Sequence, residues 1–343
     1  MNNILKTIAL SAAVILSAAA CSKWTEQKPV DFNYLTPGEK NPALYEAYLQ
    51  SIRDYRATDH QVLIARFDNK KGATTGSADH INCLPDSVDY VVLNNYKDVT
   101  VATLHEMKEL RQNKATSTLV ALDYAALDKE YKAYLETAEP TEENADSLRT
   151  VWFTAKAKAF VTDAKWYDAD GVMVSYTGKG LLSLKEDEKA AVAAFQEAFF
   201  APILAYVAET GKLFFYEGNP TTLIAPQDVL ADAKYIIVPA ESVTTIVGFN
   251  FAVMMSMGEG VPSDRFVIGV TALNITDDTA TDGLFSGDIT AIEGAAGWAV
   301  LPSSDYVKAG VCVNHVQYDY YGSQRVYRSV NSAISTMNPS PLK

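Results

Sequence analysis

Residues 166–180 read WYDADGVMVSYTGKG, and this stretch has the form of a strand that delivers side chains to a site. Asp170 and Gly171 open into a short run in which apolar residues alternate with others. Short apolar runs rich in β-branched residues are typical of strands buried on both faces of a parallel sheet. We therefore predict a strand over residues 171–176.

Seven further runs of the same kind occur along the chain. Segments with helical spacing separate most of them, at residues 101–112, 145–164 and 186–209, with shorter ones at 226–233, 244–257 and 288–293. A leading helix is predicted over 41–57 and a closing helix over 324–337. The other predicted strands are QVLIARF (61–67), SVDYVVLNN (87–95), STLVALDY (117–124), KLFFYEG (212–218), KYIIVPA (234–240), RFVIGVTA (265–272) and GWAVLP (297–302).

The alternation of strands and helices predicts the fold class. Such units have right-handed crossovers and build parallel sheets, and eight of them in one chain indicate an α/β fold, a single-domain (β/α)8 TIM barrel. An open doubly wound sheet is the alternative, but no GxGxxG or P-loop pattern follows any strand. The connection over residues 68–85 shows no clear helix, which is a departure from the barrel pattern.

The N-terminus predicts export. Residues 1–20 combine Lys6 with an apolar run too short to span a bilayer, as in a signal peptide. Small residues lead directly into Cys21, which resembles the lipobox of bacterial lipoproteins, although Ala18 replaces the usual Leu. We expect a lipidated Cys21 and tether over 21–42, a barrel over 43–343, and a membrane-anchored protein. Ordinary secretion, with Cys21 a spare thiol, is the alternative.

The composition limits the partners. The formal net charge of −13 argues against nucleic acid and anionic lipid headgroups, whereas neutral ligands such as sugars remain open. The 19 Tyr residues suit stacking on sugars and equally suit an ordinary core. Cys83 and Cys312 are either a disulfide or two free thiols, and the sequence leaves both open.

No metal or cofactor site is predicted. The four His residues have no HExxH spacing. The aspartates of the loop NITDDTATDG (274–283) offer oxygen ligands for calcium, but a solvated loop explains them better because the EF-hand spacing is absent. The methionines at 254–257 are predicted to pack in the core.

In a barrel, the functional site lies where the strands end. The predicted strand ends carry hydrogen-bonding groups among aromatic rings, a combination that fits the hydroxyls and C–H faces of a glycan. Strand ends are also polar simply because they meet loops. The residues there are Asp68, Asn69, Asn94, Asn95, Tyr96, Asp123, Tyr124, Ser175, Tyr176, Thr177, Glu217, Asn219, Glu241 and Trp298.

The predicted barrel behind a lipoprotein leader, together with residues 170–177, resembles family-18 glycoside hydrolases, the chitinase and endo-β-N-acetylglucosaminidase branch. That family has Asp-Gly-x-Asp-x-Asp-x-Glu on its fourth strand. Here Asp170 and Gly171 match, while Met173, Ser175 and Thr177 replace the three later acids. CSKWTEQKPVDF (21–32), LPDSVDYVVLNNY (84–96) and NPSP (338–341) resemble surface lipoproteins of glycan-foraging Gram-negative bacteria.

The resemblance implies a mechanism that these replacements remove. In the family, the acetamido oxygen of the substrate attacks the anomeric carbon while a carboxylic acid protonates the leaving oxygen. The Thr177 hydroxyl cannot serve as that acid near neutral pH, because its proton is held too tightly. Ser175 can hydrogen-bond an acetamido group but supplies no negative charge, and Met173 only fills space.

We therefore expect a glycan-binding outer-membrane lipoprotein, on the cell surface or the periplasmic face, that holds N-acetylglucosamine-containing oligosaccharides without cleaving them. The resemblance implies partner glycosidases and an outer-membrane importer. An active chitinase-like hydrolase using Glu217 or Glu241 as a displaced carboxylate is the alternative, and a scaffold without a sugar site is a third. The predicted ligand contacts are stacking by Tyr96, Tyr176 and Trp298, and hydrogen bonds from Asn94, Asp123, Ser175 and Glu217.

Overall fold

The computed structural model describes residues 36–340 except 139–144, 278, 288 and 323. The predicted signal peptide and Cys21 lie outside the described residues. The chain forms two compact units, Met1–Tyr48 and Leu49–Lys343. The first contains helix α2 (Pro37–Lys40) and the start of α3 (Pro42–Arg56). The second is the barrel.

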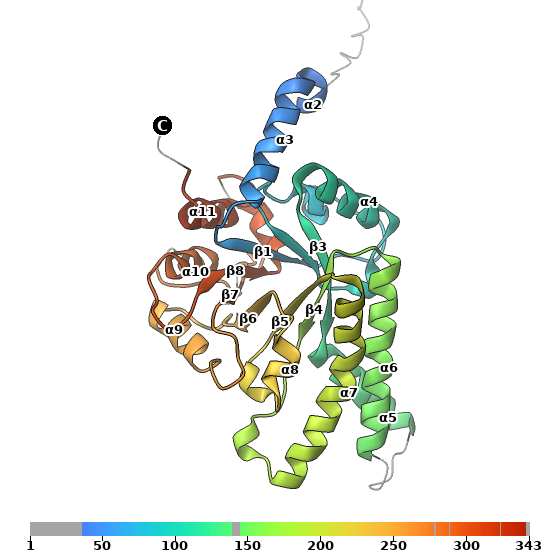
Figure 1. Cartoon of the computed structure of the whole chain (residues 1–343). Helices are drawn as coiled ribbons and strands as arrows, with labels where there is room; N and C mark the ends of the chain where they lie inside the picture. The colour runs from blue at the N-terminus through green and yellow to red at the C-terminus, as the bar shows by residue number, and fades with distance from the viewer. Residues whose placement is uncertain (1–35, 139–144, 278, 288, 323, 341–343) are drawn as a thin grey trace, which may run out of the picture. The chain divides into compact units, whose positions relative to one another are not determined.

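Eight parallel strands close into a barrel in the order β1 to β8, each paired with its neighbours in the sequence and β8 with β1 (Figure 1). The predicted (β/α)8 fold is confirmed. The strands are β1 (Val62–Phe67), β2 (Tyr90–Leu93), β3 (Ser117–Asp123), β4 (Gly171–Ser175), β5 (Leu213–Glu217), β6 (Tyr235–Pro239), β7 (Phe266–Thr271) and β8 (Lys308–Asn314).

Helices surround the strands (Figure 1). The longest is α7, which is apolar and long enough to cross a membrane by length and composition, yet Phe199, Phe200 and Ile203 are buried in the barrel core. The helices of this unit after α3 are α4 (Val101–Glu109), α5 (Tyr124–Ala138), α6 (Ala145–Trp166), α7 (Glu186–Thr210), α8 (Pro226–Leu230), α9 (Ile246–Met254), α10 (Ala291–Ala299) and α11 (Arg328–Met337).

The prediction of a strand over 297–302 is wrong. Residues 297–299 are the last turn of helix α10, and 300–302 follow it. The helix begins with a capping box in which Thr290 accepts from the Glu293 N–H and Glu293 accepts from Thr290. The eighth strand is β8, whose sequence KAGVCVN begins with Lys308 and contains Gly310. Gly310 has φ +155° and a Cβ there would meet the Val62 carbonyl oxygen at 2.0 Å, so glycine is required.

Alternate residues of the strands fill the barrel interior, as their period of two requires. The apolar filling consists of Val62, Ile64, Val92, Leu119, Ala121, Met173, Phe215, Ile237, Val267 and Cys312. Above it, toward the C-terminal ends of the strands, the same alternation brings Arg66, Asn94, Ser175, Glu217 and Asn314 inward. The interior therefore changes from apolar to polar at the mouth.

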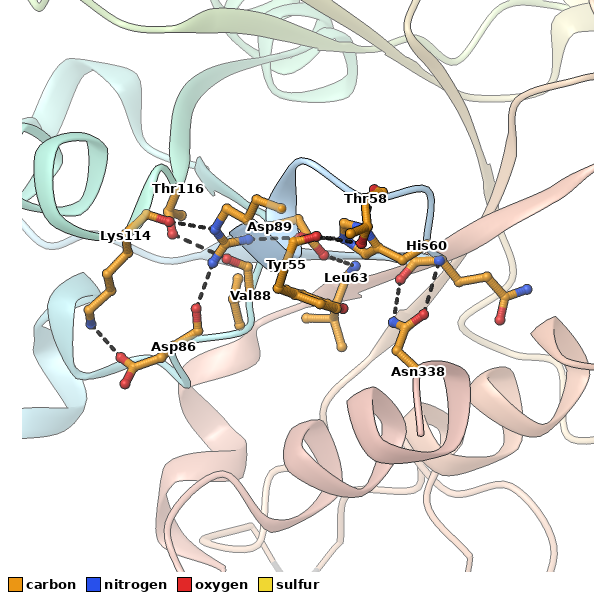
Figure 2. A network of polar contacts seen from close by, with 12 residues as sticks. Tyr55, Thr58, His60, Leu63, Asp86, Val88, Asp89, Lys114, Thr116 and Asn338 are labelled. Atoms are coloured by element: carbon orange, nitrogen blue, oxygen red, sulfur yellow. Dashed lines mark hydrogen bonds and ion pairs between the residues drawn. The ribbon is translucent and has the colours of Figure 1, made fainter. Parts of the chain in front are cut away.

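A network of polar contacts centred on Asp89 lies at the N-terminal end of the barrel (Figure 2). One Asp89 oxygen accepts from Arg56 Nη1 at 2.7 Å and from His60 Nε2 at 2.9 Å, and the other accepts from the Leu63 N–H at 2.8 Å. Lys114 pairs with Asp86 at 2.6 Å nearby. These bonds attach the end of α3 to the starts of β1 and β2.

Candidate functional site

An ion pair crosses the mouth of the barrel. Arg66, the penultimate residue of β1, bonds to Glu217, the last residue of β5. Both are buried, with 7% and 5% of their surface exposed. Ser175, at the end of β4, donates to the same Glu217 oxygen, and Arg66 Nε donates to Asn94 Oδ1 at 2.9 Å. The structure thus brings together three predicted residues, Asn94, Ser175 and Glu217, around an arginine that the sequence reading missed.

The polar network continues toward β8. Asn94 Nδ2 donates to Asp68 Oδ1 at 2.7 Å and to Asn314 Oδ1 at 3.2 Å. The other oxygen of Asp68 bonds to His315 Nδ1 and accepts from Gln317 Nε2 at 2.6 Å. Burial opposes the charge on Asp68, but the bonds from His315, Asn94 and Gln317 outweigh it and lower the pKa of this carboxyl. Asp68 is therefore a charged acceptor at the mouth.

Glu241, two residues after β6, is a carboxyl of a different kind. Burial raises its pKa, and the nearby Glu217 raises it further. A hydrogen bond to its own backbone, and to a smaller extent the charges of Arg66 and His315, lower the pKa without cancelling the rise. Glu241 is half-buried. It is therefore a candidate proton donor at the mouth, whereas Glu217 is engaged as an acceptor.

A cavity of about 350 Å³ opens beside this network. Its walls combine amides and carboxylates with two tyrosine rings, and Tyr321 is 53% exposed. Tyr318 stacks on the His315 ring at a centroid distance of 5.5 Å. Such mixed polar and aromatic walls suit sugar hydroxyls and C–H faces. The principal lining residues are Asp68, Asn69, Asn95, Asn274, Thr276, Gln317, Tyr318 and Tyr321.

The three predicted stacking rings lie elsewhere. Tyr96 packs edge-on against Phe160, and Tyr176 packs among Tyr124, Phe199 and Phe200. Trp298 is fully buried in α10 and donates to Asn250 at 2.8 Å. None of the three presents an open ring face to the mouth. The exposed aromatic side chain there is Tyr321, which follows the strand that the sequence reading misplaced.

The residues of the partial motif divide between the two ends of β4. Asp170 lies at the N-terminal end, where it accepts from the Thr118 N–H at 2.8 Å and pairs with Arg111 at 2.6 Å. Met173 is buried in the apolar interior and Ser175 is in the polar layer. Thr177 is exposed just beyond the strand. Asp170 is thus a structural residue and the positions of the missing acids hold no carboxyl.

Asp123 contributes to local structure rather than to the network. It ends β3, and its Oδ1 accepts from the Ala125 N–H at 2.8 Å and from the Ala126 N–H at 3.3 Å, which caps α5. Its side chain is exposed. Its predicted ligand contact stays a prediction.

The remaining chemical candidates are accounted for within the described residues. No group of three His, Cys, Asp or Glu side chains there is gathered to hold a metal ion. Asp278 lies outside these residues, and Asp277 accepts from Thr279. Cys83 and Cys312 are free thiols. The prediction that the methionines at 254–257 pack in the core is wrong for Met254 and Met255, which are 60% and 55% exposed.

Several solved structures share the fold. BT1044, in selenomethionine form with one glutamate replaced by glutamine, aligns with a TM-score of 0.62 and 17% identity over 89% of this chain and 94% of that one. The endo-beta-N-acetylglucosaminidase from Cordyceps militaris aligns with a TM-score of 0.60 and 18% identity over 85% and 96%. A GH18 chitinase from Pseudoalteromonas aurantia gives 0.53 and 11% over 80% and 99%.

Sequence comparison identifies the family. No curated protein sequence matches the chain. The family model "Glycoside hydrolase family 18, BT1044-like" matches residues 25–336, which is most of the chain. The match includes the barrel with its polar mouth and the β4 positions at which Met173, Ser175 and Thr177 stand. The chain therefore belongs to glycoside hydrolase family 18, in the BT1044-like group.

Proposed function

We propose that this protein binds N-acetylglucosamine-containing oligosaccharides at the mouth of the barrel without hydrolysing them. The observation that carries the proposal is the engagement of Glu217, together with the lack of a carboxyl at position 177. One Glu217 oxygen accepts from both Arg66 and Ser175, so this carboxyl is engaged in an ion pair and a hydrogen bond within the protein. Thr177 stands where the family places its acid, and its hydroxyl is not a useful donor near neutral pH.

The mouth is well suited to hold a glycan. Asn94, Ser175 and Asp68 supply donors and acceptors that can bond hydroxyl and acetamido groups. The adjoining cavity adds the faces of Tyr318 and Tyr321. Because the polar side chains are already bonded to one another, they are held in fixed orientations before a ligand arrives, which reduces the entropy lost on binding.

The cellular setting is part of the same proposal. A lipid on Cys21 would anchor the chain to the outer membrane, on the cell surface or the periplasmic face. There it would hold oligosaccharides for partner glycosidases and an outer-membrane importer. Metabolic labelling with a fatty acid, compared between the native chain and Cys21→Ser, tests the anchor, and equal labelling of both would contradict it.

Calorimetry with chitobiose, longer N-acetylglucosamine oligomers and released N-glycans tests the binding, and mass spectrometry of the same mixtures tests turnover. We expect saturable binding with all ligands recovered intact. Absence of binding to every ligand of this class would overturn the proposal. Cleavage would support the second candidate.

The second candidate is an endo-acting hydrolase of the endo-β-N-acetylglucosaminidase or chitinase type, with Glu241 as the proton donor. The observation that favours it is the burial of Glu241 beside Glu217, which raises the pKa of Glu241, the direction that a carboxyl acting as proton donor requires. If the protein turns over any of these substrates, Glu241→Gln should lower the rate by about 10² or more. An unchanged rate in that variant would exclude Glu241 as the acid.

A further inference from the structure

A second cavity, of about 360 Å³, lies outside the barrel interior and beside the end of β4. It is formed by the loop after β4, the N-terminal turns of α6 and α7, and the start of α5. It shares no lining residue with the cavity beside Tyr318 and Tyr321. Thr177 lines it, so it lies next to the proposed glycan site. Its volume falls at the lower end of the range for small-molecule sites.

Arg149 of α6 forms part of its inner wall. The guanidinium carbon lies 4.3 Å from the centre of the Phe195 ring and 5.3 Å from that of Phe153, so the group is stacked on aromatic faces. One Arg149 N–H bonds to the Tyr124 hydroxyl. Within the described part of the chain no carboxylate pairs with Arg149, although a guanidinium has five N–H donors.

The charged residues of the cavity differ in how deeply they lie. Asp146, Lys179, Asp187 and Glu188 line it with exposed side chains and form its rim. The inner wall consists of buried Tyr124, Tyr176 and Phe195 with half-buried Arg149 and Thr150. Arg149 is therefore the charge of the inner wall, and the acids stand further out.

We propose that this cavity binds a carboxylate-bearing sugar, a uronic or sialic acid residue of the glycan. The Arg149 N–H groups that are not bonded to Tyr124 would donate to the carboxylate. Arginine commonly binds a carboxylate in this way through two parallel hydrogen bonds. The rim acids and Thr150 would accept from the sugar hydroxyls. The inference rests on the proposed function, because it assigns a charged subsite beside the same glycan.

The rim also argues against other anions. Three acids against one lysine at the opening disfavour a small, highly charged ion such as phosphate. A sugar acid carries one negative charge and several hydroxyl donors, which matches one inner cation and several outer acceptors. A peptide carboxylate matches the cation but has no set of hydroxyls for the rim.

The test compares matched ligands and matched variants by calorimetry. The ligands are an N-acetylglucosamine oligosaccharide ending in a sialic or glucuronic acid, its methyl ester, the free sugar acid, and a short acetylated peptide with a C-terminal carboxylate. The variants are Arg149→Gln, Arg149→Lys, which keeps the charge and loses the fork, and Arg325→Gln, an exposed arginine outside the cavity. Thermal unfolding verifies that each variant is folded.

We expect Arg149→Gln to weaken the acidic oligosaccharide and the free acid about 10-fold or more, with Arg149→Lys intermediate and Arg325→Gln unchanged. The methyl ester should bind the native chain and Arg149→Gln equally. Equal affinity for acid and ester, or no effect of Arg149→Gln, would overturn the inference while leaving the proposed function intact. Peptide binding that matches the sugar acid and depends on Arg149 would overturn the sugar assignment. If the native chain binds the acidic ligands but not the methyl ester of the oligosaccharide, the result would count against the proposed function and not against the acid subsite.

Discussion

The two ends of the barrel each bury a carboxylate against an arginine, and they differ in what surrounds it. At the N-terminal end, Asp89 accepts from Arg56, His60 and the Leu63 N–H, and each of these partners belongs to the scaffold (Figure 2). At the mouth, Glu217 pairs with Arg66 beside an open cavity lined by amides and tyrosines. The first arrangement fixes the fold, and the second holds polar groups ready for a ligand.

The largest expected effect is a loss of stability at the N-terminal end of the barrel. Asp89→Ala would leave buried Arg56 without its carboxylate and the Leu63 N–H without an acceptor. Breaking a buried ion pair by removing one partner costs about 3–5 kcal/mol. Urea unfolding should show a loss of that size in the free energy of unfolding, with glycan affinity at the mouth unchanged under native conditions. A loss below about 1 kcal/mol would show that this end is not the fixed one.

The mouth should respond differently to the same kind of change. Glu217→Gln keeps shape and hydrogen bonding but leaves the Arg66 charge unpaired, and we expect a loss of about 2 kcal/mol in unfolding free energy. Adding Arg66→Met removes that charge and should restore most of the stability, because apolar replacement of a buried pair is often neutral. The double variant should nevertheless lose glycan affinity. Retained affinity would separate the ion pair from ligand binding.

Tyr321→Ala tests the open side of the comparison without touching the core. The ring is half-exposed beside the cavity, so we expect little change in stability and a loss of about 1 kcal/mol in glycan binding, roughly 5-fold in affinity. Tyr134→Ala, an exposed tyrosine on α5 outside that cavity, is the matched control and should bind as the native chain does. Equal losses in both variants would argue against stacking at Tyr321.

The smallest expected effect is the pH dependence of stability that His60 contributes at the N-terminal end of the barrel. His60 Nε2 bonds to Asp89, and Nδ1 lies 2.8 Å from the Thr58 carbonyl oxygen, so both ring nitrogens meet acceptors. The bond to Asp89, more than the opposing burial, raises the pKa of His60. Its stabilising contribution is therefore complete below the unfolded pKa of about 6.5 and is lost as pH rises through the folded pKa.

Unfolding free energies measured from about pH 5.5 to pH 9 should show this loss for the native chain. In His60→Gln the same decline should be weaker. Parallel curves for the two proteins would show that folding does not raise the pKa of His60.

The fold could be read from the sequence because apolar residues dominate seven of the strands. The eighth strand was missed, and it begins with a charged residue, Lys308. The fold satisfies this charge internally, because the Lys308 ammonium donates to the carbonyl oxygens of Trp298 and Leu301 at 2.9 and 3.0 Å. The apolar residues 297–302 were therefore predicted as the eighth strand instead of β8. The capping box at Thr290 and Glu293 was the available signal for a helix.

The site was only partly predictable for a related reason. Ser175 and Tyr176 are adjacent, and adjacent strand residues point to opposite faces, so only Ser175 reaches the mouth. Arg66 was missed because it lies within an apolar run. A charged residue next to the end of a barrel strand could have indicated a functional side chain. Tyr318 and Tyr321 were missed because they follow the misplaced strand. Their proximity to Asp68 depends on closure between the first and last strands, which no local pattern encodes.

Gly171 shows why the first residues of the family motif can be present although the later acidic residues are absent. A Cβ at this position would meet the Leu213 carbonyl oxygen at 2.4 Å, so any larger residue would force β4 away from β5. Strand packing therefore requires Gly171, and Asp170 holds Thr118 and Arg111, whether or not the barrel performs chemistry. A genome search keyed to that dipeptide would collect correctly assembled barrels, and only the carboxylates further along the strand would tell hydrolases from lectin-like relatives.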